Sequence, residues 1–230
     1  MTLEMGRIYN MDCIEGMKEM EDRSVDLIVT DPPYLMNYRS NKRTKTEKFS
    51  HIQNDKGAEQ LLISYIEEYH RILKDDSAIY MFCSWHHIDF FKREFEKMFK
   101  LKNSIVWNKN NHGSGDLRGA YAPKHEFVLF GHKGRSLFRE KRIPDVMNCA
   151  KVPGNKLVHP TEKPIELLEV FIRNNSDVGD VVFDGFAGSG TTAVAALNNQ
   201  RNFIGFEIDS HYTEIGNERI RVKENVGAAV

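Results

Sequence analysis

The amino-acid sequence predicts an α/β protein in which helices cover both faces of a mostly parallel sheet. Apolar runs of strand length, bounded by turn residues, alternate along the chain with segments in which apolar residues recur at helical spacing. This alternation is typical of parallel sheets, because each strand needs a crossover connection to the next. With 40% hydrophobic and 28% charged residues among 230, the chain can bury one sizeable core, so we expect a single domain.

Each expected element follows from this alternation. Strands are expected in short runs rich in β-branched and aromatic residues, and helices where apolar residues recur every three or four positions. In chain order we expect a helix near Cys13–Met20, a strand near Val25–Thr30, a helix near Ala58–Leu73, a strand near Ala78–Cys83, a helix near Ile88–Phe99, strands near Ser104–Trp107 and Glu126–Phe130, a helix near Pro164–Asn174, a strand near Val181–Phe183, a helix near Thr191–Asn198, a strand near Phe203–Glu207 and a helix near Tyr212–Val222.

The composition argues against several classes of protein. No run of about 18 or more apolar residues occurs, and the N-terminal MTLEMGRIYN lacks the pattern of a signal peptide, so we expect a cytoplasmic protein with no membrane partner. Three cysteines without a Cys-x-x-Cys pair, and histidines without ligand spacing, indicate neither a disulfide framework nor a bound metal. The net charge of −1 means that any nucleic acid must bind a local basic patch.

The stretch VVFDGFAGSGTT runs from an expected strand into an expected helix through three glycines, Gly185, Gly188 and Gly190. Glycines let a ligand approach the backbone closely. Glu207 ends the next expected strand 22 residues after Gly185, and an acidic residue at about that distance accepts hydrogen bonds from ribose hydroxyls. A phosphate-binding loop is the nearest competitor, but Thr191 stands where that loop needs Lys. A glycine-rich turn beside an incidental carboxylate is the structural alternative.

The stretch VDLIVTDPPY follows an expected strand with a carboxylate, two prolines and an aromatic ring. Ligands of open α/β sheets bind at the carboxyl ends of the strands, so Asp31 is expected to face the same ligand as the glycine loop. Pro32 and Pro33 stiffen the segment and lack N–H groups, which leaves the Asp31 carboxylate and the Pro32 carbonyl as acceptors for a substrate amino group. Tyr34 offers a face to a flat ring. A turn capped by Asp31, with a buried tyrosine, is the alternative.

Four motifs in a fixed order carry a family resemblance: DPPY at 31–34, HPTEKP at 159–164, FDGFAGSGTT at 183–192 and GFEID at 205–209. Together they resemble amino DNA methyltransferases that use S-adenosyl-L-methionine. The position of DPPY ahead of the glycine loop is similar to the circularly permuted beta class. The resemblance spans essentially the whole chain. It implies a Rossmann-like, doubly wound sheet of seven strands with an antiparallel hairpin at one edge, in one methyltransferase domain covering residues 1–230.

The resemblance also implies roles for individual residues. The flipped base would lie against Asp31, Pro32, Pro33 and Tyr34, which are the expected catalytic residues. The expected donor-binding residues are Asp12, Thr161, Lys163, Phe183, Asp184, Gly185, Gly188, Gly190, Thr191 and Glu207. Asn10-Met11, ahead of Asp12, departs from the Gly-Asp pair that the family often has there. An N-cap in an Asp-x-x-Glu box with Glu15 is therefore the alternative role for Asp12.

The chemistry of an exocyclic amine explains the DPPY segment. Such an amine is a poor nucleophile because its lone pair is delocalised into the ring, and acceptors on its hydrogens favour the geometry that attacks a methyl group. Asp31 and the Pro32 carbonyl would provide orientation and electrostatic stabilisation, while Tyr34 stacks on the extruded base. Methylation of a ring carbon uses a Pro-Cys dipeptide, which is absent. Asp at the head of the segment resembles adenine-directed members more than N4-cytosine members, so we expect N6 methylation of adenine.

Two irregular stretches, near 35–57 and 108–160, are the expected DNA-contacting insertions. The residues expected to contact DNA are Arg39, Lys42, Arg43, Lys45, Lys48, Lys109 and Arg118. A solvated basic loop is the alternative for the first stretch. Trp107, two residues before Lys109, could either line the pocket for the base or be a core residue. The second stretch is short for reading several base pairs, so we expect either a short or relaxed recognition sequence in duplex DNA or a homodimer. The sequence leaves open whether a restriction endonuclease accompanies the protein.

Three other functions stay open on the sequence alone. An N4-cytosine methyltransferase and a methyltransferase acting on RNA or on a protein amide would keep the same fold and the same DPPY segment. A nucleic-acid-binding module without catalytic activity would need no intact site. The presence of DPPY, the glycine loop and Glu207 together argues against that module.

Overall fold

Strands and helices alternate along most of the chain in a computed structural model, which describes residues 3–34, 55–111, 118–153, 158–159 and 162–227. The strands are β1 (Arg7–Asn10), β2 (Val25–Thr30), β3 (Leu73–Cys83), β4 (Lys100–Asn108), β5 (His125–Lys133), β6 (Val146–Asn148), β7 (Val181–Asp184) and β8 (Asn202–Glu207). The helices are α1 (Cys13–Lys18), α2 (Asp55–Ile72), α3 (Ile88–Met98), α4 (Ile165–Asn175), α5 (Thr191–Asn198) and α6 (Ser210–Gly227), with a short 3-10 turn at Trp85–His87.

Within these residues the strands form one eight-stranded sheet in the order β1-β8-β7-β2-β3-β5-β4-β6. All neighbours are parallel except at β5, which runs antiparallel to both β3 and β4. From β2 the sheet continues through β3, and from β7 it continues through β8 in the opposite direction. The switch point of this doubly wound sheet therefore lies between β2 and β7, and ligands of such sheets bind in the crevice at that point.

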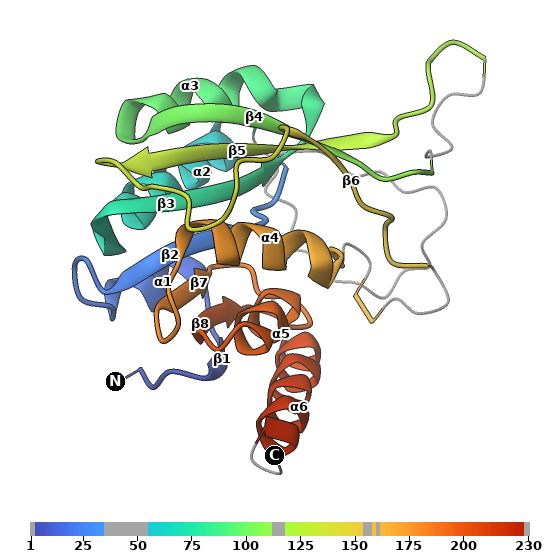
Figure 1. The fold of residues 1–230 in the computed structure, drawn as a ribbon. Coiled ribbons are helices and arrows are strands. Elements are labelled where there is room, and N and C mark those ends of the chain that lie inside the picture. The colour runs from blue at the N-terminus through green and yellow to red at the C-terminus, as the bar shows by residue number, and fades with distance from the viewer. Residues whose placement is uncertain (1–2, 35–54, 112–117, 154–157, 160–161, 228–230) are drawn as a thin grey trace.

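Two apolar clusters fill the space on the two faces of the sheet. One cluster is formed with α1, α2 and α3 and includes Met17, Tyr69 and Phe95. The other is formed with α4, α5 and α6 and includes Phe171 and Ile220. Figure 1 shows α2 behind the sheet and α4 in front of it. The rigid layers on either side hold the strand ends, and hence the loops that follow them, in fixed positions.

The fold class expected from the sequence is confirmed, with eight strands in place of seven. The strand β2 and the helix α5 have the expected bounds, whereas β1 and β6 were not expected. Both are short, and β6 is exposed at two of its three positions, so neither has the apolar run that marks a buried strand. The expected edge hairpin is β4 and β5, with β6 added outside it.

The structure describes most of the second stretch that was expected to be irregular, 108–160, but little of the first, 35–57. Residues 35–54 of the first lie outside the described part, and α2 begins at Asp55. The second was expected to hold one short strand, but β5 has nine residues and β6 follows it. Residues 118–124 extend well beyond the sheet before the chain enters β5 (Figure 1). No helix in the described part of the chain is long and apolar enough to span a membrane.

Candidate active site

The strand ends place several polar side chains on one edge of the sheet. Because β2, β7 and β8 are parallel, Asp31 after β2, Asp184 at the end of β7 and Glu207 at the end of β8 come to the same edge. The strand β5 runs the other way, so its beginning lies where its neighbour β3 ends, and Phe127 pairs with Cys83. Glu126 thereby joins the same edge from the opposite chain direction.

Asp31 is the first residue of the DPPY segment, and its two carboxylate oxygens have different surroundings. The side chain is 19% exposed, and Oδ2 lies 2.6 Å from the ammonium of Lys163. Oδ1 is enclosed and has no hydrogen-bond partner among the residues that the structure describes. Pro32 is buried and Pro33 is exposed, so the segment is anchored on one side only. A buried charged oxygen without a partner costs at least about 1–3 kcal/mol, so this one calls for a functional explanation.

Asp31 belongs to a charged cluster that also contains Tyr34, Lys109, Glu126 and Lys163. The Lys163 ammonium lies 3.1 Å from Glu126 Oε2 and donates to the Tyr34 hydroxyl at 3.3 Å. The Tyr34 hydroxyl donates to Glu126 Oε2 at 3.2 Å, and Lys109 donates to Glu126 Oε1. Two carboxylates and two ammonium groups are thus linked around one phenol.

The pKa values in the charged cluster move in directions that its geometry explains. Burial raises the pKa of Asp31, and Glu126 adds to that effect while Lys163 opposes it. Burial would also raise the pKa of Glu126, but Lys163 and Lys109 outweigh it and the pKa is lowered. Burial acts to lower the pKa of Lys163, yet Asp31 and Glu126 raise it overall. The ionised forms of Glu126 and Lys163 therefore support each other.

The glycine loop connects β7 to α5 and faces Glu207. The N–H of Gly188 donates to Glu207 Oε2 at 2.9 Å, and the N–H of Asp209 donates to Oε1 at 2.8 Å. These bonds fix the carboxylate at the end of β8, and each oxygen still has room for a further donor. Burial raises the pKa of Glu207. Gly190 has φ +82° at the start of α5, a conformation in which a side chain would be strained.

Several expected donor-binding side chains hold the loop itself. Asp184 is buried, and its oxygens accept from the N–H of Phe186 at 3.0 Å and the hydroxyl of Thr192 at 2.6 Å. Burial raises the pKa of Asp184 to about 6. Gly185 packs over Cys13, whose sulfur would lie 2.5 Å from an added Cβ. These residues shape the loop from beneath, and a donor contact by the Asp184 side chain stays a prediction.

Phe183 is also placed differently from its expected role. Its side chain is fully buried in the core and packs against Tyr69 and Phe206, so it cannot touch a ligand in the loop. Phe186, three residues later, is only partly buried and lies within the loop, edge-on to Tyr65. Phe186 therefore places its aromatic ring at the loop, a role that the sequence predicted for Phe183.

The HPTEKP segment joins the loop to the charged cluster. Glu162 lies 3.0 Å from Arg219 of α6 and accepts from the Thr191 hydroxyl of α5 at 3.5 Å. The next residue, Lys163, was expected to bind the donor, but its ammonium lies on Asp31 and Glu126. Two carboxylates thus share this buried cation, and a donor-binding role for Lys163 stays a prediction. Thr161 lies outside the described residues.

Asp12 caps the helix α1. Its Oδ1 accepts from the N–H groups of Ile14 at 2.9 Å and Glu15 at 3.2 Å, which is the alternative that the sequence left open. One carboxylate oxygen is committed in this way, and a donor-binding role for Asp12 stays a prediction.

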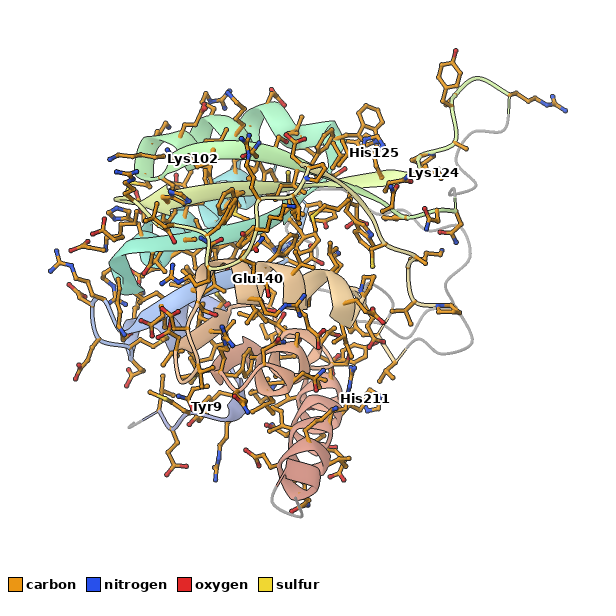
Figure 2. The ribbon with its side chains drawn as sticks, in the orientation of Figure 1. Tyr9, Lys102, Lys124, His125, Glu140 and His211 are labelled. Carbon is orange, nitrogen blue, oxygen red and sulfur yellow. The ribbon has the colours of Figure 1, made fainter. Side chains whose placement is uncertain are left out.

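The residues expected to contact DNA divide into two groups. Arg39, Lys42, Arg43, Lys45 and Lys48 all lie outside the described residues. Lys109 is paired with Glu126 and only 23% exposed, whereas Arg118 lies in the exposed segment before β5. Figure 2 shows Lys124 and His125 where that segment returns to the sheet. Trp107 is a core residue, with its ring nitrogen donating to the carbonyl of Cys149.

Glu126 is a further site residue that the sequence did not indicate. The sequence predicts only that a strand begins at Glu126. The signal was available, since a strand antiparallel to its neighbours begins at the edge where they end, and an acidic first residue of such a strand points to the site. The pattern of apolar residues does not reveal strand direction, so this signal could not be used before the pairing was known.

Comparison with known proteins gives a consistent result. The sequence profile of the N6/N4 DNA methylases matches residues 25–218. The DNA adenine methyltransferase YhdJ of Escherichia coli (strain K12) is 30% identical, with 98% of this chain and 86% of that protein aligned. The crystal structure of the M1.HpyAVI-SAM complex has a TM-score of 0.69 and 27% identity, covering 93% of this chain and 98% of that one.

The PvuII DNA methyltransferase, which is cytosine-N4-specific, shares the fold with a TM-score of 0.75 at 18% identity, over 97% of this chain and 93% of that one. The matched profile covers most of the chain, including the DPPY segment, the glycine loop and Glu207. The chain therefore belongs to the N6/N4 family of DNA methylases.

Proposed function

We propose that the chain transfers a methyl group from S-adenosylmethionine to the exocyclic N6 amine of adenine in duplex DNA. The observation that carries this proposal is the enclosed Oδ1 of Asp31 at the switch point of the sheet, an acceptor that has no hydrogen-bond partner in the described part of the chain. An amine N–H is the partner that such an oxygen lacks. The Pro32 carbonyl follows directly in the stiff segment and would accept from the second N–H of the same amine.

The donor would occupy the neighbouring strand ends. Glu207 is held at the end of β8 by two backbone N–H groups and keeps acceptor capacity for ribose hydroxyls. A Cβ added at Gly188 would lie 3.6 Å from the His159 ring, so the HPTEKP segment borders the loop at this glycine. S-adenosylmethionine supplies an electrophilic methyl group on its sulfonium. The residues at the loop and at Asp31 fit such a donor and an amine acceptor side by side.

Adenine is favoured over cytosine by the residue that heads the segment. Asp31 resembles the adenine-directed members, and the aligned relative YhdJ is named as an adenine methyltransferase. N4 methylation of cytosine is the second candidate, because the PvuII enzyme has the same fold and the acceptor pair would serve either amine. Duplex DNA is the proposed substrate because the chain belongs to a DNA methylase family.

The experiment incubates the protein with methyl-labelled S-adenosylmethionine and unmodified duplex DNA, single-stranded DNA or RNA, and identifies the modified nucleoside. We expect N6-methyladenine from duplex DNA. Asp31→Ala should abolish transfer while binding of S-adenosylhomocysteine survives, since Asp31 serves the amine and not the donor. Transfer by Asp31→Ala within about tenfold of wild type, equivalent to about 1.4 kcal/mol, would contradict the role of Asp31.

A further inference from the structure

We propose that Glu126 and Lys163 act together as positioning residues for Asp31. Lys163 holds Asp31 through one oxygen, and Glu126 offsets the charge of Lys163, so that the other oxygen keeps its basicity and its capacity to accept from the substrate amine. The inference rests on the proposed function, since it requires Asp31 to receive that amine.

The contacts of Lys163 account for all of its hydrogen-bonding capacity. An ammonium group has three N–H donors. In the structure its nitrogen lies 2.6 Å from Asp31 Oδ2, 3.1 Å from Glu126 Oε2 and 3.3 Å from the Tyr34 hydroxyl. The side chain is only 9% exposed, so water has little access to it. No donor of Lys163 remains for Asp31 Oδ1, and no other described residue donates to that oxygen.

Glu126 differs from Asp31 because its oxygens are already occupied. Lys109 donates to Oε1, while Lys163 and the Tyr34 hydroxyl both reach Oε2. A carboxylate with three donors has little capacity left for a substrate. Of the two acidic residues in the charged cluster, only Asp31 has an oxygen that is both enclosed and free to accept.

The charges explain why Glu126 is needed. The side chains of Asp31, Glu126, Lys109 and Lys163 are between 9% and 23% exposed, so water screens them weakly. With Glu126 present, two positive and two negative charges balance. Without it, the two lysines would face Asp31 alone and draw its charge toward Oδ2, and an unbalanced buried charge would remain. Glu126 therefore keeps the free oxygen of Asp31 basic enough to orient an amine.

Other titratable groups also act on Asp31. Cys83 at the end of β3, Asp184 at the end of β7 and His159 of the HPTEKP segment all interact with it electrostatically. They are unchanged in variants of Glu126 or Lys163. A difference in pH dependence between such a variant and wild type therefore comes from the substituted residue.

The test measures the pH dependence of kcat/KM for methyl transfer to duplex DNA. Its acid limb reports the ionisation of Asp31 if that carboxylate must be charged. In Glu126→Gln a negative neighbour is lost, the pKa of Asp31 falls, and the acid limb should move to lower pH. In Lys163→Gln a positive neighbour is lost, the pKa of Asp31 rises, and the limb should move to higher pH. Both variants should lose at least tenfold in kcat.

Matched variants separate positioning from folding. Lys163→Arg keeps the charge and should keep the acid limb near that of wild type. Asp26→Asn breaks a second Asp–Lys pair, 2.6 Å from Lys74 at the opposite end of β2, and should leave the limb in place. S-adenosylhomocysteine should bind Glu126→Gln and Lys163→Gln as it binds wild type.

The outcomes that overturn the inference are distinct from failure of the proposed function. If both variants fold and their acid limbs move in the same direction, or do not move, then Glu126 and Lys163 do not act on Asp31 with opposite charge effects. If Lys163→Gln loses binding of S-adenosylhomocysteine, then Lys163 binds the donor. If one variant does not fold, the direction of the limb in the other decides alone. A wild-type protein that transfers no methyl group would instead contradict the proposed function.

Discussion

Asp31 combines burial, charge and an unsatisfied oxygen, three properties that a folded protein normally keeps apart because together they destabilise it. The Lys163 ammonium at 2.6 Å reduces the cost of burying the carboxylate without satisfying both oxygens. Residues that break a local rule in this way tend to lie at functional sites, where the destabilisation serves catalysis.

Tyr34 has two separable contributions, its ring and its hydroxyl. Tyr34→Ala should weaken the extruded-base state by about 1–3 kcal/mol, the usual effect of base–aromatic stacking. Tyr34→Phe keeps the ring but removes the bonds to Glu126 and Lys163, so a smaller loss is expected. The measurement is kcat/KM together with fluorescence of 2-aminopurine placed at the target position. Equal losses in both variants would assign the role to the hydroxyl.

Glu207 tests the donor side of the site. Glu207→Ala should weaken S-adenosylhomocysteine at least tenfold, because each hydrogen bond to an ionised acceptor contributes about 1.5–3 kcal/mol. Glu207→Gln keeps one oxygen for the loop and should lose less. Titration calorimetry on the free protein gives both affinities. An Ala variant that binds as tightly as wild type would show that the ribose hydroxyls are held by other residues.

At the scale of elements, the sequence predicted those with a clear apolar signal and missed those defined by pairing. The strand β2 and the helix α5 occur with the expected bounds. The start of β3 was not predicted because the residues from Lys74 to Ser77 are polar and partly exposed, and β6 was not predicted because it only borders β4. The site divides in the same way. The DPPY segment and Glu207 could be read locally, whereas the link from Lys163 to Asp31 joins residues far apart in the chain.

The junction of the glycine loop with α5 allows a test at this scale. Gly190 has φ +82°, and an added Cβ would lie 3.0 Å from the Gly216 Cα of α6. Gly190→Ala should therefore lower the free energy of unfolding by about 2–4 kcal/mol, from backbone strain and overpacking together, and weaken S-adenosylhomocysteine.

Gly179 is the matched control for this substitution. It has φ +88° but no atom within 4 Å of an added Cβ, so Gly179→Ala should show only the strain, about 1–2 kcal/mol, and unchanged ligand affinity. Urea unfolding measures the first quantity and calorimetry the second. Similar effects of the two substitutions on ligand affinity would mean that the contact between the loop and α6 does not shape the donor site.

At the scale of the whole molecule, the sheet brings both halves of the reaction to one crevice. The switch point between β2 and β7 places the DPPY segment beside the glycine loop, although about 150 residues separate them in sequence. The net charge of −1 gives the molecule no general attraction to DNA, so we expect binding to depend on local groups such as those in residues 118–124. We therefore expect the chemistry to lie at the rigid strand ends and recognition to lie in the exposed segments.

We therefore expect the protein to distinguish only a few base pairs of its DNA target. Each base-edge contact contributes about 1–3 kcal/mol of discrimination, and the described part of residues 108–160 commits β5 and β6 to the sheet, which leaves few groups to read bases. We expect a short or relaxed recognition sequence, or a second subunit that supplies further contacts. Mapping of modified positions across a methylation-free bacterial genome, with sedimentation to give the mass of the active species, tests both. Predominant N4-methylcytosine would overturn the assignment of adenine, and one long motif methylated by a monomer would overturn the argument on specificity.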